Sequence, residues 1–396
     1  MLAAVVIVAG VAIFILGDGD GAPPSPIPFA ENKGVGIYID TSQSMRGYFR
    51  SRDESVTTIQ RFLWTWLQSE LLAVLPKTQI NFGTFGSETA KPAMLTQSLF
   101  NVFSFKNGNE RDRFFAESET RLVEQFQDKA LTRYQAFVII TDGVPSSPNM
   151  AGPDPRIIST IQEHIIDAGL HLWMIGVPVQ FAGMVYPEIP GATGRSAFRY
   201  RGARPIYLWV GSPNAELGAA LVSRFLERLR ETATKQGLSS DGIRFVELTH
   251  IEIPKVHLSL DGSENQNILV RETDDHLELA YSRRLTGVVQ IPITMRWDKV
   301  HLPRKLDLVF DAAPPTVEID NDYDKWQLAI DPREYSLIQL SLKATPVVRP
   351  WWNHWSTDDD SNASHAHQTL YLSQVVNGLR KPTQTTEVGK LKIKLK

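Results

Sequence analysis

The pattern of apolar and polar positions changes once along the chain, near residue 243. Before that point, short apolar runs alternate with longer segments in which apolar residues recur every three or four positions. The short runs are typical of buried strands, and the longer segments are typical of helices with one buried face. The runs are residues 34–40, 79–85, 137–143, 170–179 and 205–211, and the helical segments are 55–75, 113–130, 155–168 and 213–236. Strands that alternate with helices predict an α/β domain over residues 34–236, built on a doubly wound and mostly parallel sheet.

After residue 243 the alternation has a period of two, and the pattern predicts short strands without helices. The runs are residues 251–260, 277–281, 288–297, 306–310 and 335–344, with turn residues such as Asp261-Gly262 and Pro314-Pro315 between them. This spacing predicts an all-β sandwich domain of immunoglobulin-like kind over residues 243–345.

Residues 346–396 are predicted to form a C-terminal extension. The extension contains three closely spaced tryptophans, Trp351, Trp352 and Trp355. It ends in residues 390–396, where lysines alternate with apolar residues. That ending predicts an edge strand whose exposed side carries lysines.

The N-terminus is an unbroken apolar run, residues 1–17. Its length is at the short end of a membrane span, which needs about 17 to 25 residues. A cleaved signal peptide and a buried helix are alternatives, but a basic start and a small-x-small cleavage site are not evident. We therefore expect an uncleaved single-pass anchor, a Gly- and Pro-rich linker over residues 18–33, and a globular part on the periplasmic or extracellular side.

Composition narrows the classes of function. The net charge of −3 provides no global attraction to nucleic acid. The chain has no cysteine, which excludes disulfides, thiolate catalysis and cysteine-ligated zinc. Phosphate-binding loops, nucleophile elbows and zinc-protease motifs are absent from the sequence, so we do not expect an enzyme.

Oxygen-bearing side chains follow two of the predicted strands directly. Asp40 ends the run 34–40 and is followed by Ser42 and Ser44, and the run 137–143 ends with Asp142 and then Gly143. The carboxyl ends of neighbouring parallel strands share one edge of a sheet, so these side chains are expected to meet. Carboxylates and hydroxyls are hard ligands that suit Mg²⁺ or Mn²⁺. A haloacid-dehalogenase-like phosphatase also has an Asp at a strand end and uses Mg²⁺, but it needs a second aspartate at the position where this chain has Ser42. The serine argues against phosphoryl transfer by that route.

Asp40-x-Ser42-x-Ser44, together with the later Thr141-Asp142-Gly143, resembles the metal-ion-dependent adhesion site of von Willebrand factor A domains. In that family a third loop contributes a threonine just before a helix. Thr120 fits that role best, with Ser118 as the alternative. The resemblance implies that Asp40, Ser42, Ser44 and Thr120 lie near the ion, with Asp142 held through water.

The resemblance also implies a function. A metal ion held in this way keeps an open position that a carboxylate of another protein can fill. The predicted function is a membrane-tethered, divalent-metal-dependent module that captures an Asp or Glu of a partner protein. The alternative is a non-catalytic assembly or adaptor subunit that serves a separately encoded ATPase or enzyme complex.

One basic segment is not accounted for by the predicted metal site. Residues 180–202 and their flank carry Arg195, Arg199, Arg201 and Arg204 without aliphatic periodicity, which suggests an insertion or a β-hairpin. These arginines could contact a phosphate or an acidic partner, or they could line a solvated loop.

Overall fold

The structure is a computed structural model. It describes residues 34–396 except 53, 88–91, 144–154, 188–196, 237–239, 250–254, 261–267, 274–275, 282–286, 298–305, 314–317, 323–324, 332, 347–349, 361–362 and 381–384. The predicted anchor, residues 1–17, and the linker, residues 18–33, lie outside the described residues. Within the described part, no helix is both long and apolar enough to cross a membrane.

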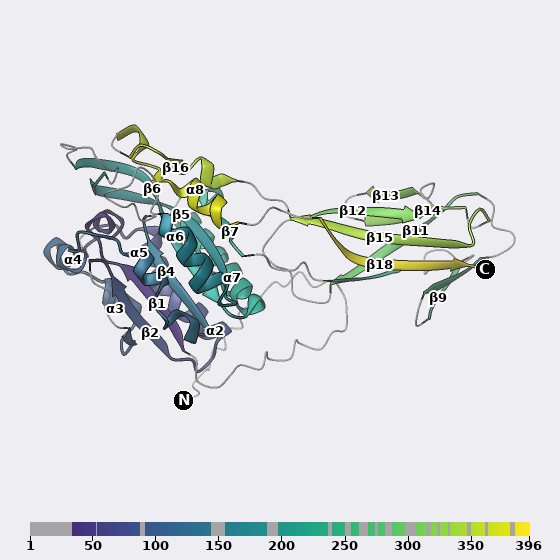
Figure 1. Ribbon diagram of the computed structural model, residues 1–396, viewed down its shortest axis with the longest axis horizontal. Helices are drawn as coiled ribbons and strands as arrows, with labels where there is room; N and C mark the ends of the chain where they lie inside the picture. Colours follow the sequence, from purple (N-terminus) through teal and green to yellow (C-terminus); the bar gives the residue numbers. More distant parts are fainter. Residues whose placement is uncertain are drawn as a thin grey trace, which may run out of the picture. The chain divides into compact units, whose positions relative to one another are not determined.

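The first region of the chain combines strands with short and long helices (Figure 1). Short 3₁₀- and π-helical segments carry the label η. Its elements are β1 (Val35–Asp40), η1 (Gln43–Tyr48), α1 (Thr58–Phe62), η2 (Leu63–Leu67), α2 (Gln68–Val74), β2 (Ile80–Phe85), β3 (Ala93–Met94), α3 (Leu99–Phe103), α4 (Gly108–Phe114), α5 (Leu122–Phe126), η3 (Leu131–Arg133), β4 (Ala136–Thr141), α6 (Pro155–Ile161), η4 (Gln162–Ile166), β5 (His171–Val185), β6 (Phe198–Ser212), α7 (Ala215–Lys235), η5 (Ser240–Gly242) and β7 (Arg244–Glu247).

The second region is mostly strands. Its elements are β8 (Val256–Leu260), β9 (Ile268–Glu272), β10 (Leu277–Tyr281), β11 (Val289–Trp297), β12 (Leu306–Ala313), β13 (Glu318–Asp322), β14 (Lys325–Ile330), β15 (Leu337–Pro346), η6 (Trp351–Asn353), β16 (Ser356–Thr357), η7 (Ala363–His365), β17 (Thr369–Leu370), α8 (Leu372–Leu379) and β18 (Thr386–Leu395).

Seven strands of the described chain form one sheet, here called the central sheet, in the order β3-β2-β1-β4-β6-β5-β7. Within it, β1 pairs in parallel with β2 and with β4. The other four pairings, β2–β3, β4–β6, β5–β6 and β5–β7, are antiparallel. The predicted doubly wound, mostly parallel sheet is therefore wrong: the sheet is mixed, with a parallel core of three strands.

The cause of this difference is the hairpin formed by β5 and β6. These two strands pair over their full length, from His171 opposite Ser212 to Val185 opposite Phe198. A parallel pair needs a long crossover connection, usually a helix, whereas strands that follow each other directly pair antiparallel. The sequence pattern contains no helix between residues 179 and 205. The chain therefore turns back, and β6 inserts between β4 and β5.

Alternate strand residues supply two apolar clusters, one on each face of the central sheet. On β1, Val35, Ile37 and Ile39 join one cluster, and Tyr38 joins the other. Helices α1, α2 and α7 bury their apolar residues in the first cluster, and α5, α6 and α8 bury theirs in the second. Strands β1 and β4 are buried at every position, which explains their continuous apolar runs.

The face of the central sheet whose cluster contains Tyr38 is partly covered by residues 351–360 and 363–379, here called the tryptophan segment. Trp351 donates a hydrogen bond from Nε1 to the carbonyl oxygen of Phe245, which lies on strand β7 (3.0 Å). The hydroxyl groups of Tyr207, on β6, and Thr369 lie 2.7 Å apart. Gly176 on β5 is required here, because a Cβ atom at that position would lie 2.6 Å from the Trp355 ring.

The remaining strands of the described chain form a five-stranded sheet, β12-β15-β18-β10-β9, a four-stranded sheet, β13-β14-β11-β8, and a two-stranded parallel sheet, β16-β17. The five-stranded and four-stranded sheets contribute to one apolar cluster, which includes Leu258, Ile291, Leu340 and Ile393. The five-stranded sheet is also mixed, since β10 and β18 pair in parallel. An immunoglobulin-like sandwich is built from antiparallel sheets, so that part of the prediction needs the same correction.

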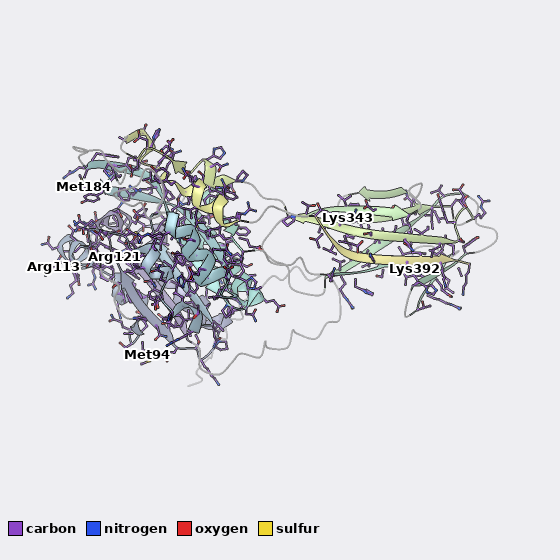
Figure 2. All side chains as sticks on the ribbon, in the orientation of Figure 1. Met94, Arg113, Arg121, Met184, Lys343 and Lys392 are labelled. Atoms are coloured by element: carbon purple, nitrogen blue, oxygen red, sulfur yellow. The ribbon has the colours of Figure 1, made fainter. Side chains whose placement is uncertain are left out.

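The C-terminal strand does not lie at an edge as predicted. Strand β18 lies between β15 and β10, inside the five-stranded sheet. The alternation itself has the expected effect: Leu391 and Ile393 are buried, while Lys392 and Lys394 are exposed (Figure 2 labels Lys392). A period of two identifies the buried face of a strand, but it does not identify the neighbours of that strand.

Candidate metal site

The site forms where β1 and β4 end side by side. These strands pair in parallel, with Ile39 opposite Ile140, so Asp40 and Thr141 reach the same edge of the central sheet. Asp40 is fully buried, and Asp142, one residue past the end of β4, is 3% exposed. Two carboxylates are thus held in the protein interior at the carboxyl ends of two central strands.

Asp40 is fixed by three hydrogen bonds. Its Oδ1 atom accepts one from the backbone N–H of Ser42 (2.8 Å). Its Oδ2 atom accepts one from the Thr141 hydroxyl (2.8 Å) and one from the Thr120 hydroxyl (3.2 Å). Asp40 thereby links the loop after β1, the end of β4 and the segment before α5.

The two serines connect this carboxylate to the second one. The hydroxyl oxygens of Ser42 and Ser44 lie 3.0 Å apart. The Ser44 hydroxyl donates to Oδ1 of Asp142 (3.1 Å). The structure therefore brings all five predicted site residues into one hydrogen-bonded group. These five residues and Thr141 are here called the carboxylate network.

The segment that carries Thr120 is held against the first loop by backbone contacts. The N–H of Glu117 donates to the Thr41 carbonyl (3.2 Å), and the N–H of Gln43 donates to the Glu117 carbonyl (2.9 Å). The helix predicted over residues 113–130 is divided into α4 and α5, and Thr120 lies just before α5. Ser118, the alternative, faces Ser87 instead, with 3.2 Å between their hydroxyl oxygens.

Burial shapes the electrostatics of the site. It raises the pKa of Asp40 to about 7, and the negative charge of Asp142 adds to the rise. Hydrogen bonds from Ser42 and Thr141 act in the opposite direction. Burial also raises the pKa of Asp142, although the Arg204 guanidinium opposes that rise. A cation near these carboxylates therefore stabilises their charged forms.

Two residues that contact the predicted site residues were not predicted to do so. Thr141 belongs to the Thr-Asp-Gly motif, and its hydrogen bond to Asp40 follows from the parallel pairing of β1 with β4. Arg204 comes from β6, and its Nη2 atom lies 3.8 Å from Oδ2 of Asp142. The sequence singled out this arginine without a location, because its place depends on the hairpin that puts β6 beside β4.

The residues fit a hard divalent cation. Oδ2 of Asp142 is buried and accepts no hydrogen bond from the described residues, and its ion pair with Nη2 of Arg204 is long, at 3.8 Å, so lone pairs of this oxygen are left for a metal ion. The hydroxyls of Ser42 and Ser44 are additional oxygen ligands of the type that Mg²⁺ accepts. Within the described part of the chain, no cluster of three or more His, Cys, Asp or Glu residues could hold a metal. The predicted set has only two carboxylates, so it depends on its hydroxyls.

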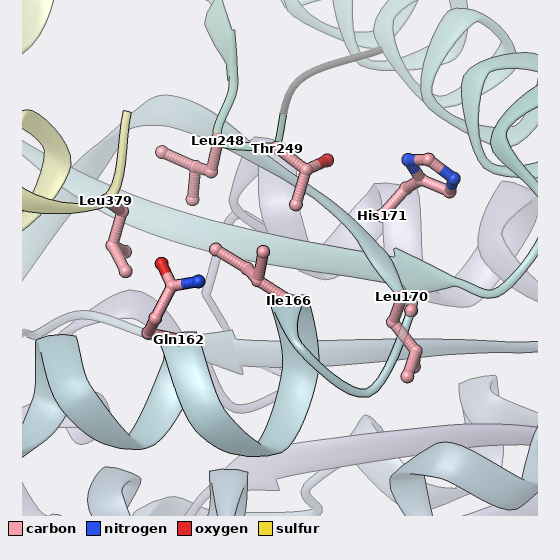
Figure 3. A pocket seen from close by; sticks show the side chains of 8 residues that line it. Gln162, Ile166, Leu170, His171, Leu248, Thr249 and Leu379 are labelled. Carbon is pink, nitrogen blue, oxygen red and sulfur yellow. The ribbon is translucent and has the colours of Figure 1, made fainter. Parts of the chain in front are cut away.

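A separate small cavity of about 230 Å³ lies beside the end of η4 and the start of β5. Figure 3 shows Ile166, Leu170, Leu248 and Leu379 around it, together with polar side chains such as His171. Burial lowers the pKa of His171. None of the five predicted site residues lines this cavity, so it does not belong to the candidate metal site.

Comparison of the chain with known protein families, with curated proteins and with solved structures gives no match.

Proposed function

We propose that the carboxylate network binds Mg²⁺ or Mn²⁺ and that the bound ion captures an Asp or Glu side chain of a partner protein. The observation that carries the proposal is Oδ2 of Asp142, a buried carboxylate oxygen that accepts no hydrogen bond from the described residues and has only a long ion pair, 3.8 Å, with Arg204. It lies in a group whose other members, Asp40, Ser42, Ser44 and Thr120, also present oxygen atoms.

The chemistry of the donors suggests how such capture works. Mg²⁺ prefers octahedral oxygen coordination and gives up its waters reluctantly, so a site with few protein carboxylates leaves ligand positions to water. A carboxylate from outside can replace one of these waters. Because two carboxylates supply at most two negative charges and Arg204 supplies a positive one, the loaded site retains net positive charge. The ion supplies Lewis acidity and charge, while the protein residues hold it and orient the open side.

Tethering to a membrane by residues 1–17 is part of the same proposal. It rests on the apolar run in the sequence and on the Gly- and Pro-rich residues that follow. Protease accessibility in spheroplasts tests the placement of the globular part, and a mature N-terminus within residues 18–35 contradicts the anchor.

Calorimetric titration with MgCl₂ and with MnCl₂ tests the metal site. Wild type is expected to bind, Asp40→Ala and Asp142→Asn are expected to lose binding, and the exposed Asp167→Asn is the matched control that keeps it. Binding to the native state also stabilises the protein, by about 2.7 kcal/mol at a hundredfold excess over the dissociation constant. Equal titration curves for wild type and Asp40→Ala contradict the site.

Partner capture needs its own experiment. Affinity purification in Mg²⁺ is compared with purification in EDTA, for wild type and for Asp40→Ala. A protein partner retained only by wild type in Mg²⁺, and released by EDTA, is the expected result. Retention that is indifferent to both EDTA and the substitution contradicts metal-mediated capture.

A further inference from the structure

A larger polar cavity, of about 730 Å³, lies between the residues just before and within α1 and the hairpin of β5 and β6. The described residues that line it are Arg50, residues 54–58, Arg61, residues 180–182, Arg201 and Gln236. Its volume is in the range of small-molecule sites, about 300 to 1,000 Å³. No residue of the carboxylate network lines it, so it is a different site from the proposed metal centre.

Three of the described residues that line this cavity are arginines, and Arg50 is the most firmly held of them. Its Nη1 atom donates to the carbonyl oxygen of Gly47 (2.8 Å), and its Nη2 atom donates to the carbonyl oxygen of Gln180 (3.2 Å). These partners are neutral, so they fix the guanidinium without cancelling its charge. Preorganisation of this kind reduces the entropy lost when a ligand binds.

The positive charges around the cavity are poorly compensated. Among the described residues, no carboxylate lies within ion-pair distance of Arg50, Arg61 or Arg201. Burial lowers the pKa of Arg50; the charge of Glu54 opposes this, and the charges of Arg111 and Arg201 lower it further. Like charges that approach each other in this way leave a positive potential that an anion relieves.

Glu54 carries the only carboxylate among the described residues that line the cavity. Its Oε2 atom already accepts hydrogen bonds from the backbone N–H (3.0 Å) and the hydroxyl (3.2 Å) of Ser51, and lies 3.6 Å from Nη1 of Arg111. Among the described lining residues, three arginines against one glutamate give a formal charge of +2.

We infer that this cavity binds a phosphate group. A phosphate monoester carries about −1.5 to −2 charges at neutral pH, which matches the charge of the lining. Its several oxygens can engage more than one guanidinium, and the arginine fork fits phosphate in a bidentate manner. A single carboxylate, with one charge, neutralises only half of this excess. The basic residues of the β5–β6 hairpin thus gain a role through Arg201.

Calorimetric titration of the full-length protein in EDTA tests the inference, because EDTA removes any divalent ion that could hold phosphate at the carboxylate network. The probes are inorganic phosphate, pyrophosphate and glycerol 3-phosphate. The last stands for a lipid headgroup or another phosphate ester, and the first two stand for free phosphate. Tighter binding of glycerol 3-phosphate assigns the ester, and tighter binding of the inorganic probes assigns free phosphate.

The variants separate the cavity from general surface charge. Arg61→Gln combined with Arg201→Gln removes two exposed guanidiniums and is expected to weaken binding at least tenfold. Arg133→Gln removes an exposed arginine at the opposite ends of the sheet strands and is expected to have no effect. Glu54→Gln removes the opposing carboxylate and is expected to strengthen binding severalfold, a gain that misfolding cannot produce.

The inference is overturned if none of the three probes shows saturable binding. It is also overturned by binding that survives the double substitution unchanged, or that falls equally in Arg133→Gln. These outcomes do not depend on divalent metal, so they are distinct from a failure of the proposed metal site.

Discussion

The carboxylate network and the tryptophan segment both lie against the central sheet, but the network buries charged groups and the segment buries aromatic rings. The network brings two carboxylates, Asp40 and Asp142, into the interior, where charge is costly. The tryptophan segment brings large rings, such as Trp352, which is 1% exposed. Burial of aromatic surface is among the strongest stabilising contributions in a protein.

This contrast separates residues that stabilise the fold from residues that are available to bind a ligand. Buried carboxylates with raised pKa values destabilise the folded state at neutral pH, and such groups persist where they bind something. The rings of the tryptophan segment pack against one another and against Tyr207, with centroids of Trp351 and Trp355 4.9 Å apart. Substitutions in the segment are therefore expected to affect folding, and substitutions in the network are expected to affect binding.

The largest effect is expected from Trp352→Ala. Removal of a buried aromatic side chain costs about 3–5 kcal/mol, and it also breaks the hydrogen bond from Nε1 to Oδ1 of Asn377 (3.0 Å). Urea unfolding measures the loss. The control, Val288→Ala, alters a residue that is 69% exposed and is expected to change stability by less than about 0.5 kcal/mol. A similar small loss in both variants contradicts the role given to the tryptophan segment.

The second effect is the pH dependence of metal-free stability. Asp40 has a pKa of about 7 in the folded protein against an ordinary value of 3.8. The folded state therefore holds more protons between these values, and the contribution of Asp40 is full below about pH 4 and is lost as the pH rises to about 7. One pKa unit corresponds to 1.36 kcal/mol, so the loss is on the order of a few kcal/mol.

Urea unfolding in EDTA from pH 4.5 to pH 8 measures this dependence. Other groups titrate in the same range, so the informative quantity is the difference between wild type and Asp40→Asn. We expect wild type to lose stability relative to the variant as the pH rises, and MgCl₂ to restore it. A difference that stays constant across the range contradicts the raised pKa.

The third effect concerns the cation already present beside the network. Nη2 of Arg204 lies 3.8 Å from Asp142, so its charge repels an incoming divalent ion. Arg204→Gln is expected to raise Mg²⁺ affinity about tenfold, or about 1.4 kcal/mol, in a calorimetric titration. Arg201→Gln removes the same charge from an exposed position on the same strand and is expected to change affinity far less. Equal increases in both variants would indicate only an effect of net charge.

The smallest effect separates the two candidates for the third loop. Thr120→Val keeps the shape of the side chain but removes the hydroxyl that donates to Asp40, and is expected to lower metal affinity about fivefold, or about 1 kcal/mol. Ser118→Ala, which alters a hydroxyl that faces Ser87, is expected to leave affinity unchanged. The same titration distinguishes them, and the reverse pattern contradicts the choice of Thr120.

Much of the candidate site could be predicted because two short motifs, each at the end of an apolar run, carry most of its residues. Asp40, Ser42 and Ser44 follow one strand at alternate positions, and Asp142 follows another. Parallel pairing of β1 and β4 was enough to bring these residues together. Helix α7 was equally legible, since its apolar residues from Leu217 to Leu229 recur at helical spacing and it begins at the N-cap Asn214.

Strand partners could not be predicted, because an apolar run shows that a strand is buried but not what lies beside it. The run at residues 205–211 could have extended a parallel sheet, and only the missing crossover helix favours the antiparallel hairpin that carries Arg204. In the same way, the lysine alternation of β18 is compatible with an edge or with the interior of a sheet. Contacts of the tryptophan segment, such as that of Trp351 with Phe245, also join distant residues, and no motif in the sequence marks the two residues as partners.

The long return of the chain to the central sheet has a consequence for biogenesis. Strand β7 ends at Glu247, and the tryptophan segment that packs against Tyr207 and Gly176 begins at Trp351, about a hundred residues later. At a translation rate of 5–20 residues per second, roughly 5 to 20 s pass before the covering rings leave the ribosome. During that interval the nascent chain presents an uncovered aromatic surface, which is the kind of surface that holding chaperones recognise and that drives aggregation when synthesis stops early.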